Sequence, residues 1–291
     1  MAKALVLGGA TGLLGKTLVR TLNDRGWETN TLGREEGDLL NPEFLRDRLE
    51  WYAPDVVVNT VAWTQVDAAE DDPDGAMAVN RSLPDALARI ISGMPQVWLG
   101  QISTDFVFSG YHTEPFRETD TPNPCNTYGK TKLAGEQAVL SILPDRGCVI
   151  RTAWLFGPGR DNFVDKILNL SKTRDVLKVV DDQLGSPTYT VDAALWIAML
   201  AENRATGIWH AVNSGQASWC ELATEAVQLT PGLCRVLPIP SSQWPQKAKR
   251  PANSGLDNAR LAEMLGKKPR CWHQALREHV LREYADARRE P

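Results

Sequence analysis

The fold is decided by the stretch Ala4-Leu-Val-Leu-Gly-Gly-Ala-Thr-Gly-Leu-Leu-Gly15, a short apolar run that leads into a glycine-rich loop. Gly9, Gly12 and Gly15 form a G-x-x-G-x-x-G variant of the dinucleotide-binding fingerprint. The glycines permit a tight turn and a close approach of a pyrophosphate. The helix that follows offers unpaired N–H groups and a positive dipole end to that anion. The stretch therefore predicts a strand, a phosphate-binding turn and a helix at the start of a dinucleotide-binding sheet.

Apolar runs and helical patterns then alternate through the first half of the chain. Strands are predicted at residues 28–32, 55–59 and 97–102. One helix is predicted to begin at Pro42, and another is predicted from Ala76 to Ile91. The run Asp55-Val-Val-Val-Asn59 is continuously apolar in its centre, which is typical of a strand buried on both faces of a parallel sheet. We predict an α/β fold, with a Rossmann-type, doubly wound parallel sheet in residues 1–155.

The alternation loosens in the second half of the chain. Residues 156–291 are predicted to form mainly a smaller C-terminal substrate-binding lobe, with some segments returning to the first domain. Helices are predicted at residues 164–170, 191–201, 221–229 and 272–284, and a strand at 177–180. His273 and His279 lie in the last of these helices, and we predict that both are surface residues.

The segment Tyr128-Gly-Lys-Thr-Lys132 is a candidate catalytic motif. A tyrosine and a lysine four residues apart on a helix project from one face, and the ammonium would favour the phenolate and lower the tyrosine pKa. Thr104 follows the strand at 97–102 and could hold the same substrate oxygen. Tyr-x-x-x-Lys also occurs by chance, but this strand and the glycine loop share the carboxyl edge of the sheet, so we predict one site. Gly135 is predicted to break the apolar spacing of this helix.

The end of the second predicted strand bears on the choice of cofactor. Enzymes that prefer NAD(H) usually carry Asp or Glu here, to accept a hydrogen bond from the ribose 2′-hydroxyl. This chain has Gly33-Arg34, which leaves room for a 2′-phosphate and offers it a guanidinium. We predict a preference for NADP(H), with NAD(H) possible. The alternative is that Arg34 is a solvated loop residue paired with Glu35 or Glu36.

Composition excludes several classes of function. The 291 residues carry a net charge of −4 without a basic cluster of useful length, so we predict no nucleic-acid partner. No apolar run approaches the ~18–20 residues of a membrane span. The five cysteines are widely spaced and the four histidines lack metal-ligand spacing. We therefore predict reduced thiols, a cytoplasmic location and no bound metal.

On these residues and several further stretches, the chain resembles the extended short-chain dehydrogenases/reductases, and within them the dTDP-4-dehydrorhamnose reductase family. The stretches that carry the resemblance are spread in order over nearly the whole chain. They are Gly8 to Gly15, Val57-Val-Asn59, Ala62-Trp-Thr64, Ser103 to Gly110, Tyr128 to Glu136, Arg151 to Gly157, Asn162-Phe163, Asp182 to Thr188 and Lys249-Arg-Pro251.

The resemblance implies NADPH-dependent reduction of the 4-keto group of a nucleotide-activated 6-deoxyhexose, dTDP-4-dehydro-L-rhamnose to dTDP-L-rhamnose. Tyr128 would protonate the alkoxide, Lys132 would bind the nicotinamide ribose, and Thr104 would hydrogen-bond the reacting oxygen. The implied substrate contacts are Thr104, Asp105, Trp154, Gln183 and, for the diphosphate, Arg250, although a lone basic loop residue is more often solvated. The cofactor contacts, including Arg34, are Gly9, Thr11, Gly12, Leu13, Leu14, Gly15, Asp38, Leu39, Ala62, Trp63, Thr64, Tyr128 and Lys132.

Three features separate this chain from its relatives or leave alternatives open. The related sugar-nucleotide 4,6-dehydratases carry Thr-Asp-Glu at the positions of Thr104, Asp105 and Phe106. Phe106 therefore replaces the glutamate, and an acid needed for dehydration is missing. Lys16 and Val191 stand where some family members hold a magnesium-bridged dimer with glutamates, so we predict a monomer or a metal-independent homodimer. A non-catalytic regulatory subunit of the methionine adenosyltransferase type, or a sister reductase or epimerase acting on another sugar nucleotide, remains an alternative.

Overall fold

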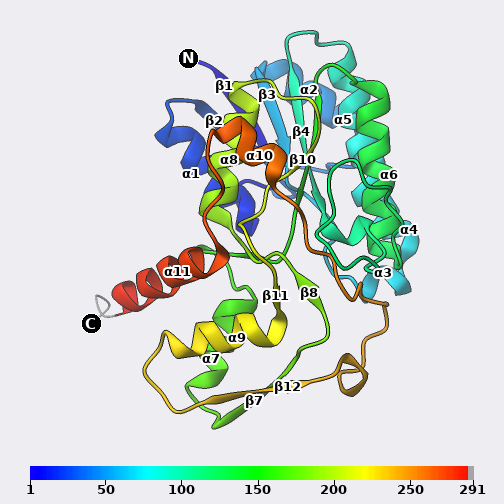
Figure 1. Ribbon diagram of the computed structural model, residues 1–291. Coiled ribbons are helices and arrows are strands. Elements are labelled where there is room, and N and C mark those ends of the chain that lie inside the picture. Colours follow the sequence, from blue (N-terminus) through cyan, green and yellow to red (C-terminus); the bar gives the residue numbers. More distant parts are fainter. Residues whose placement is uncertain (288–291) are drawn as a thin grey trace.

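Six parallel strands form the central sheet of the structure, a computed structural model that describes residues 1–287 (Figure 1). The strands lie in the order β10-β5-β4-β3-β1-β2, and every ladder between them is parallel. Their bounds are β1 Lys3–Leu7, β2 Glu28–Leu32, β3 Val56–Asn59, β4 Trp98–Thr104, β5 Gly147–Thr152 and β10 Gly207–His210. The predicted Rossmann-type parallel sheet is therefore confirmed.

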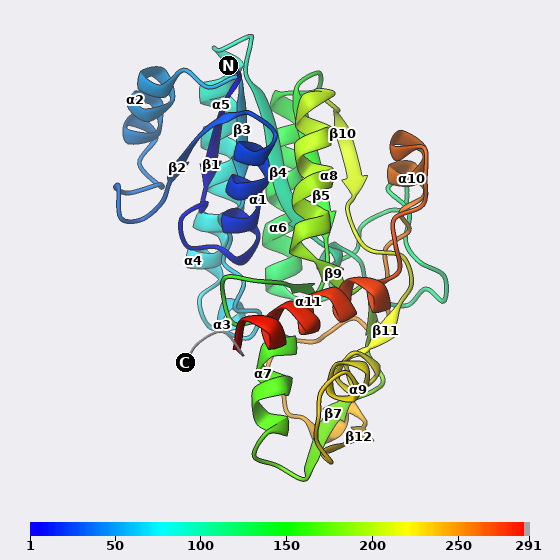
Figure 2. The ribbon, with the colours of Figure 1, turned by 90° about the vertical axis from the view of Figure 1, so that its left-hand side faces the viewer.

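Helices cover both faces of this sheet. On one face lie α1 (Leu13–Asp24) and α8 (Thr190–Glu202), side by side in Figure 2. Their apolar stripes, with Leu18 and Ile197 fully buried, pack against alternate side chains of the strands. On the other face lie α2 (Pro42–Tyr52), α5 (Leu83–Ser92) and α6 (Thr127–Ile142). Because strands between two helical layers are buried on both faces, β3 is apolar apart from Asn59 at its end.

The predicted helix from Ala76 to Ile91 is not continuous. After the short helices α3 (Ala68–Asp71) and α4 (Pro73–Met77), a π-helical turn, Ala78–Ser82, leads into α5. The Asn80 carbonyl in this turn approaches α6 so closely that a Cβ on Gly135 would stand 2.1 Å from it. The prediction that a break in apolar spacing at Gly135 marks the end of this helix was wrong: α6 continues through it, and the glycine allows the close contact between the two elements.

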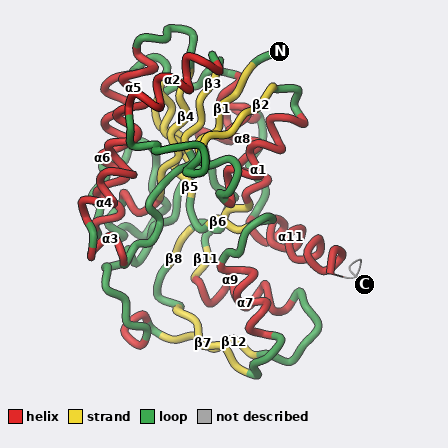
Figure 3. Tube along the Cα trace, turned by 180° about the vertical axis from the view of Figure 1, so that it is seen from behind, coloured by secondary structure: helices red, strands yellow, loops and turns green. Residues whose placement is uncertain are grey.

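The second half of the chain contributes to two regions. Helix α8 and strand β10 join the central sheet, whereas most other segments form the smaller group at the bottom of Figures 1 and 3. These remaining segments are β6 Leu155–Phe156, α7 Phe163–Ser171, β7 Val176–Val180, β8 Leu184–Gly185, β9 Thr188–Tyr189, β11 Ala217–Ser218, α9 Trp219–Gln228, β12 Arg235–Ile239 and α11 Trp272–Ala287. Helix α10 (Ala259–Leu265) instead lies beside β10 in Figure 1, and its Leu261 packs into the core under α1 and α8. The predicted helices and the strand at 177–180 are present, with ends that differ by at most three residues.

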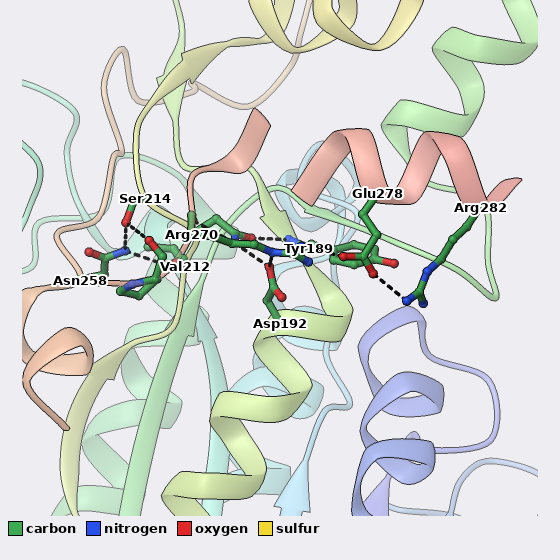
Figure 4. A network of polar contacts seen from close by, with 10 residues as sticks. Tyr189, Asp192, Val212, Ser214, Asn258, Arg270, Glu278 and Arg282 are labelled. Atoms are coloured by element: carbon green, nitrogen blue, oxygen red, sulfur yellow. Dashed lines mark hydrogen bonds and ion pairs between the residues drawn. The ribbon is translucent and has the colours of Figure 1, made fainter. Parts of the chain in front are cut away.

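A polar network links α8 and α11 (Figure 4). Arg270 donates to Asp192 on α8 and to Glu278 on α11, at 2.7 and 2.6 Å. On α11, His273 is exposed, but the prediction of a surface position was wrong for His279. The His279 side chain is 1% exposed, and its Nε2 lies 2.9 Å from Asp165 Oδ1 on α7. An imidazole has apolar edges, and here they pack against the side chains beneath the helix.

No helix among residues 1–287 combines the length and apolar character that crossing a bilayer requires.

Candidate active site

The glycine loop presents an open helix N-terminus. Gly12 caps α1 with extended backbone, no side chain accepts from the first N–H groups, and the first turn carries no acidic residue. Gly8 has φ +78°, which favours glycine, and a Cβ on Gly15 would stand 2.4 Å from the Gly8 carbonyl oxygen. Uncapped N–H groups at the positive end of a helix fit an anionic group, so this loop suits the pyrophosphate of a dinucleotide.

Arg34 lies beside the loop at the end of β2, which is next to β1 in the sheet. The Gly33 N–H donates to Glu36 Oε2 at 2.7 Å, so Glu36 is engaged by the backbone. Arg34 is exposed, and among residues whose side chains are described it forms no ion pair with Glu35 or Glu36. The alternative that Arg34 pairs with its neighbours is therefore absent from this structure, and the guanidinium is available to an anion.

Two other predicted cofactor residues near β2 serve the fold. Leu39 is 6% exposed and belongs to the core cluster beneath α2 and α5. Asp38 is exposed, and its Oδ1 accepts from the Leu40 N–H at 2.9 Å, which shapes the turn before α2. Both residues follow β2, on the side of the sheet where the glycine loop lies. The Leu39 side chain packs in the core, and the Asp38 side chain bonds to the backbone of its own turn.

The segment Ala62-Trp63-Thr64 follows β3 at the same edge, and Asn80 holds it there. The Asn80 side chain accepts from the Trp63 N–H at 2.9 Å and donates to the Trp63 carbonyl at 3.2 Å. It also donates to Thr131 Oγ1 on α6 at 3.0 Å. One buried amide thus ties the predicted cofactor segment to the helix of Tyr128 and Lys132. Sequence reasoning missed Asn80, because a single asparagine in an apolar helical pattern gives no signal.

Thr104, Asp105 and Tyr128 come together where β4 ends. Thr104 Oγ1 donates to Asp105 Oδ1 at 3.0 Å and accepts from the Phe106 N–H at 3.2 Å. The second carboxylate oxygen of Asp105 accepts from the Ser254 hydroxyl. Burial raises the pKa of Asp105 to about 6, although both hydroxyls act in the opposite direction. Phe106, which replaces the glutamate of the dehydratases, packs edge-on against the Tyr128 ring at 5.8 Å.

The prediction that Lys132 lowers the Tyr128 pKa was wrong for this structure. Burial raises the pKa of Tyr128 to about 12, while the adjacent Thr104 hydroxyl lowers it and the charge of Asp105 raises it further. Lys132 is buried and donates to the Ile102 carbonyl at 2.6 Å, and it is not among the groups that shift the Tyr128 pKa. Desolvation lowers the pKa of Lys132 to about 8, and Glu136 one turn away opposes that shift.

Glu136 is itself held by the neighbouring strand of the sheet. Arg151 of β5 donates to both of its carboxylate oxygens at 2.9 and 2.7 Å, and both side chains are almost fully buried. Breaking such a pair by removing one partner typically costs ~3–5 kcal/mol. The pair therefore secures α6, and with it Tyr128 and Lys132, against the sheet.

The substrate residues implied by the family resemblance lie on the C-terminal side of this cluster. Trp154 has φ +47° and stacks on Trp219 at 3.5 Å, and a Cβ on Gly185 would collide with its indole. Gln183 is buried, just before β8. Trp154 is thus enclosed between Trp219 and Gly185, and any side chain at position 185 would collide with the indole.

Arg250 is not a solvated loop residue. It forms a two-pronged pair with both carboxylate oxygens of Asp67 at 2.8 Å, and this pair is the main reason that the Asp67 pKa falls to about 2. The Arg250 side chain is 13% exposed. In this structure the Arg250 guanidinium is already bonded to Asp67. A diphosphate would therefore have to share the guanidinium with Asp67 or displace Asp67 from it. Lys16, which stands where the family resemblance implies a metal-binding glutamate, donates to the Gly159 carbonyl at 3.2 Å.

A nucleotide loop on a parallel sheet, with threonine, tyrosine and lysine at the same edge, defines a short-chain dehydrogenase/reductase of the extended type. The chain belongs to the family described as RmlD substrate binding domain, whose model matches residues 2–285.

Individual relatives agree with this family. A dTDP-4-dehydrorhamnose reductase of Streptomyces griseus is 43% identical over 277 residues, covering 93% of this chain and 90% of the relative. A dTDP-4-keto-6-deoxy-D-glucose reductase of Streptomyces niveus is 37% identical over 246 residues, or 84% of each chain. The crystal structure of the Bacillus anthracis dTDP-4-dehydrorhamnose reductase, in complex with NADP, superposes with a TM-score of 0.92 at 30% identity, covering 97% of this chain and 100% of that one.

Proposed function

We propose that the protein reduces the 4-keto group of a nucleotide-activated 6-deoxyhexose with NADPH, converting dTDP-4-dehydro-L-rhamnose to dTDP-L-rhamnose. The observation that carries the proposal is the cluster of Thr104, Tyr128 and Lys132 at the sheet edge that also holds the glycine loop. The names of its relatives supply the substrate class.

The residues of the cofactor edge fit a dinucleotide phosphate. The uncapped N-terminus of α1 would hold the pyrophosphate, and Arg34 would pair with the 2′-phosphate. Lys132 already has a buried carbonyl partner, and an ammonium has two further N–H donors for a ribose. When bound, the reduced nicotinamide supplies the hydride.

Tyr128 is suited to donate the proton. With a pKa of about 12 it stays protonated at neutral pH, which is the state that an acid needs at the start of a reduction. The Thr104 hydroxyl lies beside it and orients the phenol. Donation of the proton as the hydride arrives prevents full negative charge from building on the substrate oxygen. Replacement of the dehydratase glutamate by Phe106 removes an acid from this place and favours reduction over dehydration.

A sister reductase is the second candidate, because the Streptomyces niveus relative carries the name of a reductase for a different 4-keto sugar. A regulatory subunit without catalysis is the third, and the presence of Thr104, Tyr128 and Lys132 together argues against it.

A panel of nucleotide 4-keto sugars, each mixed with NADPH and the protein, tests all three. The proposal expects fastest loss of nicotinamide absorbance with dTDP-4-dehydro-L-rhamnose, together with dTDP-L-rhamnose as product. Faster turnover of another sugar would support the sister reductase, and no turnover of any member would support the regulatory subunit.

We also propose a monomer or a metal-independent homodimer, and a cytoplasmic location. The first is supported by Lys16 and Val191, which offer no oxygen ligand at the implied metal position. The second is supported by the five cysteines, all of which are free thiols in the structure.

A further inference from the structure

Asp105 is a buried carboxylate without a cationic partner. It is 3% exposed, and among the described side chains no lysine, arginine or histidine pairs with it. A buried charge of this kind depends on hydrogen bonds to each oxygen. Two side chains provide them: Thr104 Oγ1 donates to Oδ1 at 3.0 Å, and the Ser254 hydroxyl donates to Oδ2.

The direction of these bonds follows from the chemistry of the groups. An ionised carboxylate only accepts, so both hydroxyls must donate to it. Thr104 has one hydroxyl proton, and once that proton points at Asp105 the Thr104 oxygen offers its lone pairs elsewhere. One lone pair faces the Phe106 N–H at 3.2 Å, and the Tyr128 phenol lies within hydrogen-bonding reach of Thr104. The orientation of Asp105 therefore decides how Thr104 meets the proton donor.

Ser254 in turn decides the orientation of Asp105. The serine is 1% exposed, and it is separated from Asp105 by 149 positions in the chain. Its N–H donates to the Leu184 carbonyl at 2.9 Å, and the neighbouring Asn253 N–H donates to the Gly110 carbonyl at 3.2 Å. Backbone bonds on both sides hold the hydroxyl in place. The same residue thus contacts the predicted substrate stretch at Leu184 and the catalytic cluster at Asp105.

We propose that Ser254 is a positioning residue for the reduction, which holds Asp105 so that Thr104 is aligned with Tyr128. This inference rests on the proposed function, because it assigns a role in the same reaction. Ser254 does not touch the reacting atoms in this scheme and acts only through Asp105.

The test is a double-mutant cycle between Ser254→Ala and Asp105→Asn, read both as turnover and as stability to urea. We expect Ser254→Ala to lower kcat about tenfold, the size of one lost charge-assisted hydrogen bond, while the Kd for NADPH stays within about twofold. In the Asp105→Asn background the same change should lower kcat less than about threefold, because the serine then has no carboxylate to hold. Ser214→Ala is the matched control: it also removes a buried serine hydroxyl, one that donates to the Pro269 carbonyl at 2.7 Å, and should leave kcat unchanged.

Each result decides between the possible roles. Equal kcat losses from Ser254→Ala in both backgrounds, or an unchanged kcat in the single variant, would overturn the inference even if the wild type reduces the substrate. A stability coupling between Ser254 and Asp105 with no kcat coupling would assign the serine a purely structural role, and would also overturn it. A wild type that turns over no 4-keto sugar would refute the proposed function first, and the positioning role with it.

Discussion

Replacing Tyr128 by phenylalanine should abolish most of the reduction and leave the fold intact. The change removes only the phenolic hydroxyl, because the ring remains and keeps its edge-on contact with Phe106 at 5.8 Å. Thr104 keeps its bonds to Asp105 and to the Phe106 N–H, so the change does not leave the Thr104 hydroxyl without a partner. The loss is then that of the proton donor alone, and a general acid contributes typically ~10²–10⁴-fold to the rate.

The assay is single-turnover reduction of a dTDP-4-keto-6-deoxyhexose, with NADPH binding measured separately by fluorescence. We expect the Kd for NADPH to change less than about twofold while the rate falls at least about a hundredfold. Tyr52→Phe is a matched control: it removes another buried phenol, which donates to the Glu28 carbonyl at 2.8 Å far from the site, and should leave the rate unchanged. A Tyr128→Phe variant that keeps more than about a tenth of the wild-type rate would refute Tyr128 as the acid.

Three further outcomes are expected. Arg34→Ala should weaken NADPH by ~1.5–3 kcal/mol and NADH hardly at all, because only NADPH carries the 2′-phosphate; equal losses in titrations of both cofactors would contradict the assignment. Asp105 has a pKa raised to about 6 against an unfolded value near ~4, so its burial favours the protonated folded state and its contribution to stability is lost as pH rises through 6. Relative to Asp105→Asn, the wild type should therefore lose roughly 1–3 kcal/mol of unfolding free energy between pH 4 and 7, and a constant difference in urea melts would argue against this. EDTA should change neither turnover nor sedimentation; a dimer that dissociates on chelation, with activity restored by magnesium, would show that Lys16 and Val191 are misaligned with the metal ligands of the relatives.

The local signals in the sequence were sufficient for the sheet and for the position of the site. Apolar runs and glycine spacing are properties of neighbouring residues, and parallel strands must bring their carboxyl ends to one edge. For that reason the sequence alone is enough to place the strands, the glycine loop, Arg34, Thr104, Tyr128 and Lys132.

Tertiary structure decided what depends on partners distant in the chain. The pKa of Tyr128 rises because the phenol is buried, and Lys132, which was expected to lower it, donates to the Ile102 carbonyl. Gly135 allows contact with a π-helical turn, and His279 is buried against Asp165, 114 positions away. Asn80 and Ser254 carry no motif of their own. Their roles arise because the fold brings one amide to Trp63 and one hydroxyl to Asp105, and such contacts between remote segments have no periodicity that a sequence can display.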